Sequence, residues 1–215
     1  MKAKLKQLTP ETLWNVLRTI NRYRRLIIYK YWGRPFKPGE TSKARNRRIK
    51  EGFFDIYCIG KGLDIGFGGD LITENADGFD FEHGDAQDLK SIADNAYDFV
   101  YSSHTIEHLP DPSMAIKNWF RVLKPGGYLI VYLPHRDLYE KKKTLPSRFN
   151  PTHLHFFLLD QDENPNTIGV VPLIERTLTG YEIVYAKECS EGHKITDPLI
   201  HSDGEYSIEV VIKKL

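Results

Sequence analysis

The spacing of apolar residues near the start of the chain predicts an amphipathic helix. Thr9-Pro10-Glu11 has the residue types of a helix start, and Gly33 and Pro35 end the segment. A second short helix is expected over residues 43–51, closed by Gly52. The apolar positions recur at three- and four-residue steps, which is the period of one helix face: Leu13, Val16, Ile20, Tyr23, Ile27 and Tyr31.

From Gly62 onward, short apolar runs alternate with helical or loop stretches. The runs predict strands at 62–65, 78–81, 98–101, 128–133, 181–188 and 206–213, and helices at 112–123 and 167–178. The last strand alternates apolar and mostly polar residues, which predicts a half-exposed antiparallel strand. The order predicts an α/β fold whose mostly parallel sheet ends in an antiparallel strand pair. The buried side of the helix at 112–123 is expected to carry Met114, Ala115, Trp119 and Val122.

Charge divides the chain unevenly. The net charge is +1, but residues 1–50 hold fifteen lysines and arginines against two acids, Glu11 and Glu40. We therefore expect a basic N-terminal helical extension over 1–52 and one α/β domain over 53–215. Four explanations of the basic extension stay open: contact with the chain's own acidic body, an anionic membrane surface, a phosphorylated substrate, or nucleic acid.

Two cysteines, Cys58 and Cys189, are too few and too far apart for a disulfide framework or a zinc site. The first residues lack the apolar core of a signal peptide, and no apolar run is long enough to span a bilayer. The composition predicts a cytoplasmic protein, with peripheral contact at the inner face of the membrane as a further expectation.

The first chemical motif is GLDIGFGGD at residues 62–70, an apolar strand that enters a glycine-rich turn. Glycines there allow a ligand to approach the backbone closely. The nicotinamide fingerprint GxGxxG fails, because Leu71 stands at its third glycine position. Asp64 before the turn suits a ligand that carries an ammonium group.

Four further motifs follow in order. Asp80 ends the next strand, where a carboxylate can accept both ribose hydroxyls of a nucleoside. Asp85 with Ala86 can read an adenine edge, through the carboxylate and a backbone N–H. YDFVYSSHTIEHLPDP ends a strand in small polar residues, and RVLKPGGYLIVYLP places a tight turn before a buried strand.

Together the five motifs, within residues 60–134, resemble the UbiE/UbiG-like (methyltransferase type 11) branch of class I S-adenosylmethionine-dependent methyltransferases. The resemblance implies a Rossmann-like fold and S-adenosylmethionine as cofactor. Only 14 positions separate Gly66 from Asp80, so the first crossover should lack the family's full helix. Glu107 and His108 match the family's Glu-His pair and are expected to brace a loop. The residues implied at the cofactor are Asp64, Gly66 and Gly68 at the methionine part, Asp80 at the ribose, Asp85 and Ala86 at the adenine, and Ser102, Ser103 and His104 beside the sulfonium.

Residues 135–165 would then form an acceptor-binding loop. Arg136 and Arg148 could clamp an anion, and His104 or His135 could serve as base. His153-x-His155 offers two potential metal ligands, but no third is set by spacing, so no metal is expected. The residues expected to bind substrate are Arg136, Asp137, Tyr139, Arg148, Asn150 and His153.

The sequence thus predicts methyl transfer to an oxygen or nitrogen of a small, polar, probably anionic acceptor, with a phosphorylated compound or a sugar as candidates. The 135–165 loop has a weaker likeness to methyltransferases of polysaccharide biosynthesis. Two alternatives remain: an RNA methyltransferase that uses the basic arm, and a scaffold that binds the cofactor without turnover.

Overall fold

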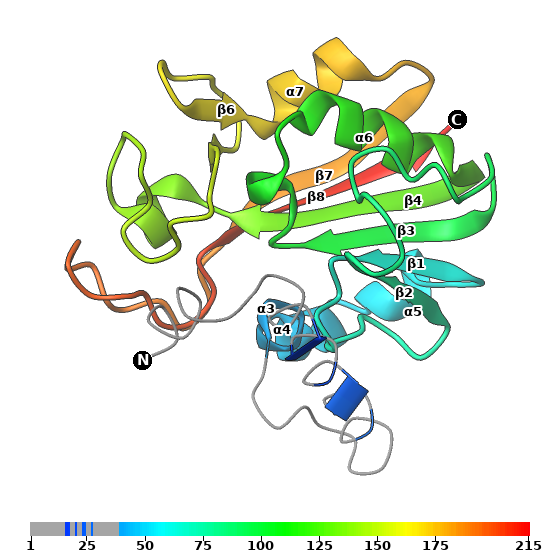
Figure 1. Ribbon diagram of the computed structural model, residues 1–215, viewed down its shortest axis with the longest axis horizontal. Helices are drawn as coiled ribbons and strands as arrows, with labels where there is room; N and C mark the ends of the chain where they lie inside the picture. Colours follow the sequence, from blue (N-terminus) through cyan, green and yellow to red (C-terminus); the bar gives the residue numbers. More distant parts are fainter. Residues whose placement is uncertain (1–15, 18–19, 21–22, 25–26, 28–38) are drawn as a thin grey trace.

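A six-stranded sheet forms the centre of the molecule (Figure 1). The computed structural model describes residues 16–17, 20, 23–24, 27 and 39–215. The first four strands of the sheet are parallel, and the last two run antiparallel to their neighbours, as predicted. In sheet order, the strands are β2 (Ala76–Phe79), β1 (Gly62–Ile65), β3 (Tyr97–Ser103), β4 (Leu123–Pro134), β8 (Ser207–Lys214) and β7 (Tyr181–Cys189).

Helices cover both faces of this sheet (Figure 1). One face packs against α6 (Pro112–Arg121) and α7 (Val170–Thr177), and the other against α3 (Glu40–Lys43), α4 (Arg45–Lys50) and α5 (Phe53–Tyr57). Each face therefore has its own apolar core. The helices α3 and α4 belong to the expected N-terminal extension, yet Ala44 and Arg48 are fully buried against the sheet.

Beyond the carboxyl ends of β3 and β4, two long segments gather at the same side of the molecule (Figure 1). The first follows β4 and contains the short helix η2 (Arg136–Glu140) and a two-stranded sheet of β5 (Phe156–Leu158) and β6 (Thr167–Gly169). The second connects β7 to β8. The parallel strands thus point toward the loops that can build a site.

The helix α6 begins as the sequence predicts. Asp111 caps it by accepting a hydrogen bond from the backbone N–H of Met114, and Pro112 occupies the first turn. Ala115, Trp119 and Val122 are fully buried, as expected. Met114 is not: its side chain lies in the first turn, at the edge of the covered face, and is 38% exposed.

The half-exposed last strand is a wrong prediction. β8 lies between β4 and β7, and residues 207–212 are all buried. The alternation reflects two different cores instead. Ile208, Val210 and Ile212 face the α6 and α7 side, whereas Val211 packs in the core on the α3–α5 side. Glu209 is buried because Arg47 and Arg48 pair with it.

Other helix and strand boundaries differ from the predicted ones by a few residues. The second strand lies at 76–79 rather than 78–81, and the stretch at 167–178 divides into β6 and α7. Residues 66–75, between β1 and β2, form turns without a helix, which agrees with the short crossover expected from the spacing.

The helix expected before Gly33 falls largely outside the described residues. Those of its apolar positions that are described, Val16, Ile20, Tyr23 and Ile27, are between 50% and 59% exposed. Within the described part of the chain, no helix is long and apolar enough to cross a bilayer.

Candidate active site

The turn after β1 is shaped by glycines in a left-handed conformation. Gly66 has φ +73° and Gly68 has φ +55°. A Cβ on Gly66 would collide with Oγ1 of Thr105, which itself donates to the carbonyl of Ile65. The turn therefore needs glycine for its backbone angle and for its close approach to the loop after β3.

Two aspartates hold this turn. Asp80 follows β2, and its carboxylate accepts from the backbone N–H of Gly68 (3.2 Å) and of Phe81 (2.8 Å). Asp64 is fully buried in β1, and its Oδ2 accepts from the N–H of Ile72 at 2.7 Å. Its Oδ1 has no hydrogen-bond partner among the described residues. Burial raises the pKa of Asp64 well above its usual range.

The remaining residues expected at the cofactor lie along the same sheet edge. Ser102 is buried at the end of β3 and donates to the carbonyl of Ile65, and Ser103 is buried beside it. Asp85 is exposed, while the carbonyl of Ala86 accepts from Nε1 of Trp119 at 2.7 Å. The carboxyl edges of β1, β2 and β3 thus bring these groups to one side of the sheet.

His104 lies directly beyond β3, with φ +47°, unusual for a residue other than glycine. Its Nε2 is 2.9 Å from Oγ of Ser207. Rings of Tyr132, Tyr139 and Tyr206 surround it at centroid distances of 5.6, 6.5 and 5.9 Å. Burial lowers the pKa of His104 to about 4, so its ring is neutral at pH 7.

Two carboxylates approach the His104 ring from opposite elements. Oε2 of Glu40 in α3 is 4.0 Å from Nε2, and Oε1 of Glu107 is 3.8 Å from Nδ1. Burial disfavours charge on Glu40, but His104, Lys43 and Tyr206 outweigh it and hold the pKa of Glu40 below its usual value. Burial raises the pKa of Glu107, which lies in the short helix η1 (Ile106–His108), to about 8.

Sequence reasoning did not single out Glu40, Lys43 or Tyr206 for this site. Nζ of Lys43 donates to Glu40 at 3.0 Å and to the hydroxyl of Tyr206 at 2.5 Å. These groups come from α3 and from the residue before β8, far apart in sequence. No local pattern marks them, because only the packing of α3 on the sheet brings them together.

His135, the other expected base, has different neighbours. Its Nδ1 accepts from the backbone N–H of Asp137, and its Nε2 is 3.0 Å from Oε1 of Glu188 in β7. Nε2 therefore connects the end of β4 to β7, whereas Nδ1 holds the first turn of η2. Its described contacts do not include His104 or Glu107.

The two arginines expected to clamp an anion are already engaged. Arg136 is buried and pairs with Asp137 and Glu163, each at 2.7 Å. Arg148 donates to the carbonyl of Pro198. The charge of Arg136 is thus neutralised inside the protein, which gives no support to the expected contact with an anionic ligand.

Tyr139 and His153, in contrast, lie beside the His104 environment. Their rings stack with centroids 5.4 Å apart, and both side chains are buried. Nδ1 of His153 is 2.6 Å from Oε1 of Glu140. The side-chain oxygen of Asn150 accepts from the N–H and the hydroxyl of Thr152 within its own turn. His155 does not join His153, because its Nε2 contacts the carbonyl of Leu109.

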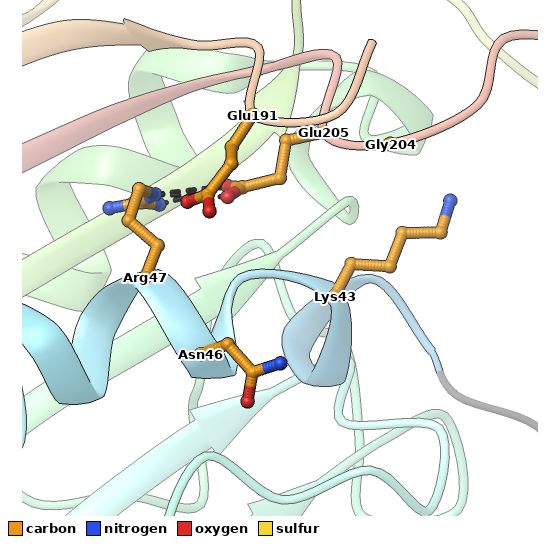
Figure 2. Close-up of a pocket in the computed structure, with 6 residues that line it drawn as sticks. All are labelled: Lys43, Asn46, Arg47, Glu191, Gly204 and Glu205. Atoms are coloured by element: carbon orange, nitrogen blue, oxygen red, sulfur yellow. Dashed lines mark hydrogen bonds and ion pairs between the residues drawn. The ribbon is translucent and has the colours of Figure 1, made fainter.

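A cavity of about 260 Å³ opens next to α3 and α4 (Figure 2). Arg47 extends across it toward Glu205, and the two groups pair at 3.0 Å. Its other lining groups are Lys43, Asn46, Glu191 and Gly204, and Lys43 connects it to Glu40 and Tyr206. The residues expected at the cofactor do not line this cavity.

The basic residues of α4 have partners in the chain's own acidic body. Arg47 pairs with Glu205 and Glu209, and Arg48 with Glu209. For residues 39–52, the structure thus matches the intramolecular explanation of the basic charge.

Comparison with known proteins connects this geometry to a family. The family described as "Methyltransferase domain" matches residues 63–131. A protein of Mycolicibacterium smegmatis named as a probable S-adenosylmethionine-dependent methyltransferase is 35% identical over 74 residues, 34% of this chain and 28% of that protein. Phosphoethanolamine N-methyltransferase 1 of Triticum aestivum is 34% identical over 81 residues, 36% of this chain and 16% of that protein. The chain therefore matches only a minor part of the length of these curated relatives.

A solved structure described as "Conversion of a Disulfide Bond into a Thioacetal Group during Echinomycin Biosynthesis" has the same fold. Its TM-score is 0.50 at 14% identity, and the match covers 80% of this chain and 81% of that one. At this identity the likeness concerns the fold alone.

Proposed function

We propose that the chain is a class I methyltransferase that transfers a methyl group from S-adenosylmethionine to a small polar acceptor, because residues 63–131 match the family described as "Methyltransferase domain". The observation that carries this proposal is the sheet edge where Asp80 accepts from the N–H of Gly68. It joins a carboxylate suited to ribose hydroxyls with a turn that leaves room for a ligand.

The residues present fit the cofactor. Oδ1 of Asp64 is buried without a hydrogen-bond partner in the described chain, so an ammonium group of the methionine part would satisfy it. Asp80 would hold the ribose, and Asp85 with Ala86 the adenine. When bound, the cofactor supplies an electrophilic methyl group on a sulfonium. The task of the protein is then to hold the acceptor atom in line with that group, at roughly 3–3.5 Å.

The groups around His104 favour a neutral or cationic acceptor over an anionic one. Glu40, whose pKa stays below its usual value, brings a carboxylate to the ring, and Tyr139 and Tyr206 add aromatic faces, which attract cations. The arginines that would have attracted an anion are occupied by Glu163, Asp137 and a backbone carbonyl. We therefore propose an acceptor with an amine or a hydroxyl as its reacting group.

We assign the proton-accepting or orienting role to His104 rather than to His135. A neutral His104 ring carries a lone pair, and it follows the strand that borders the cofactor edge. Replacing His104 with Asn should lower kcat while S-adenosylmethionine affinity stays unchanged. His135→Asn is the matched control, and an equal loss of kcat in both variants would contradict the assignment.

Calorimetry with S-adenosylmethionine tests the cofactor site. Asp80→Ala should weaken binding by about 2–4 kcal/mol, because two charge-assisted hydrogen bonds to the ribose are lost. Asp94→Ala, which removes only a surface partner of Arg121, is the control and should bind normally. Unchanged affinity in a folded Asp80→Ala variant would remove Asp80 from the site.

A matched pair of acceptors tests the charge preference. The Triticum relative is named for phosphoethanolamine, so ethanolamine and phosphoethanolamine differ only by the group in question. We expect ethanolamine, which lacks the anionic phosphate, to be methylated or bound better than phosphoethanolamine, measured by methyl transfer and by thermal shift with S-adenosylhomocysteine. A preference for phosphoethanolamine would instead support the hypothesis of an anionic acceptor.

An RNA acceptor has less support from the described residues. Arg47 and Arg48 form ion pairs with Glu205 and Glu209. An RNA substrate would require activity to fall steeply with added salt. We expect a shallow salt dependence instead.

A further inference from the structure

We propose that Glu107, His108 and His153 form a binding site for one divalent transition-metal ion of the Zn²⁺ type. Nε2 of His108 is 3.7 Å and Nε2 of His153 is 3.9 Å from Oε1 of Glu107. One ligand atom from each residue lies within 4.8 Å of the other two. The two rings are inclined at 73° with centroids 4.9 Å apart, and both Nε2 atoms lie near the same oxygen of Glu107.

The hydrogen bonds on the far sides of the rings set their tautomers. Nδ1 of His153 donates to the carboxylate of Glu140 at 2.6 Å, and Nδ1 of His108 donates to the carbonyl of Thr152 at 3.1 Å. Both acceptors require the proton on Nδ1. In the neutral rings, Nε2 then carries the lone pair, which is the form that ligates a metal.

Glu107 provides the independent reason for a cation. Its side chain is fully buried, and neither carboxylate oxygen accepts a hydrogen bond from another described residue. Two lone-pair nitrogens facing such a carboxylate give three acceptors around one point. A cation there would satisfy the buried carboxylate and could be ligated by both imidazoles, whereas a single proton could serve only one contact.

The ligand set indicates the class of ion. Two imidazoles and one carboxylate are a recurrent set for Zn²⁺ and related first-row ions, with an open position for an oxygen ligand. Ligand atoms about 2.1 Å from such an ion lie about 3.4 Å apart. The two distances from Oε1 of Glu107 to the histidine nitrogens, 3.7 and 3.9 Å, are close to this value, and the two nitrogens lie within 4.8 Å of each other, so the rings must move closer when an ion binds. His108 is 30% exposed, which gives the ion a route from solvent.

The position of this site joins two segments. Glu107 and His108 follow β3, whereas His153 and its partner Glu140 belong to the long segment after β4. Glu107 also lies 3.8 Å from His104. A bound ion would therefore fix the acceptor-side segment beside His104. Metal binding itself does not depend on the proposed methyl transfer.

Metal binding to the full chain tests the proposal directly. The purified protein is stripped with chelator, then titrated with Zn²⁺ by calorimetry and with Co²⁺ by its visible absorption, and bound metal is counted by mass spectrometry. We expect one ion per chain. His153→Ala and Glu107→Gln should each weaken binding at least tenfold, and Glu140→Gln by about 10-fold through the tautomer of His153.

His155→Ala is the matched control, because His155 contacts only the carbonyl of Leu109 among its described hydrogen-bond partners. It should bind metal as the wild type does, and Asp80→Ala should do so as well. Far-UV circular dichroism confirms that each variant is folded, and a bound ion should raise the melting temperature of the wild type but not of His153→Ala. Absence of binding in the wild type would overturn the site, as would equal losses in His155→Ala and His153→Ala.

Discussion

Replacing Arg48 with Met should destabilise the fold by about 3 kcal/mol. Arg48 is fully buried, and its guanidinium contacts Oε2 of Glu209 at 2.6 and 2.7 Å and the hydroxyl of Tyr101 at 3.0 Å. Methionine keeps most of the apolar stem but removes the charge. Breaking a buried pair from one side costs about 3–5 kcal/mol. We expect the lower end of this range of destabilisation, because Arg47 still contacts Glu209 at 2.9 Å.

The pKa of Glu209 gives an independent magnitude. Burial disfavours its charge, but Arg48 and Arg47 outweigh burial and lower the pKa from 4.5 to about 2. At about 1.4 kcal/mol per pKa unit, this shift corresponds to about 3 kcal/mol. Because the folded pKa is depressed, the stabilisation is fully present above about pH 4.5 and is lost as the pH falls toward about 2. The difference in free energy of unfolding between Arg48→Met and the wild type should therefore become smaller as the pH falls over that range.

Urea denaturation followed by far-UV circular dichroism at several pH values measures both effects. Lys50→Met is the control, since Lys50 and Glu191 form an exposed pair at 3.3 Å that should contribute at most about 1 kcal/mol. An Arg48→Met variant no less stable than Lys50→Met would refute the reasoning. The reasoning would also be refuted if the difference in free energy of unfolding between Arg48→Met and the wild type stayed the same between pH 6 and pH 3.

Three further predictions concern other parts of the chain. Cys58 and Cys189 are buried and burial raises the pKa of each thiol to about 12, so both should react with a thiol reagent only after denaturation. Asp111→Ala should cost about 1 kcal/mol in urea denaturation, because α6 loses its cap, and an unchanged midpoint would contradict this. Residues 10–32 combine exposed apolar side chains at Val16, Ile20 and Ile27 with arginines, so we propose weak binding to anionic vesicles; sedimentation should show it at low salt, and equal binding to neutral vesicles would reject it.

Local sequence patterns were enough for most of the fold. Strand β1 follows from Leu63 and Ile65 before a glycine-rich turn, and α6 from apolar residues at helical spacing, because these signals act within a few residues. The residues expected at the cofactor edge could be proposed for the same reason: each stands at the end of a strand, and parallel strands end at one edge of a sheet.

The acceptor side was decided by tertiary structure. Glu107 and His153 are 46 positions apart, and nothing in the spacing of either residue predicts that their side chains meet. Arg136 has the sequence context of a surface clamp, but Glu163 and Asp137 neutralise it after the loop folds back. Such contacts depend on the way in which long loops fold back on the domain. The spacing of apolar residues within a few positions does not encode that arrangement.

The last strand shows the same division most clearly. Its alternation of side chains determined a β-strand with two unlike faces, and this much needs only the two-residue period of the backbone. Whether the polar face meets water depends on what covers it. Here α4 brings Arg48 over Glu209, so a charge that would mark an exposed face is buried with its partner. The sequence by itself determined the period of β8, and only the packing of a helix from residues 45–50 decided its burial, because ion pairing offsets the cost of removing a carboxylate from water.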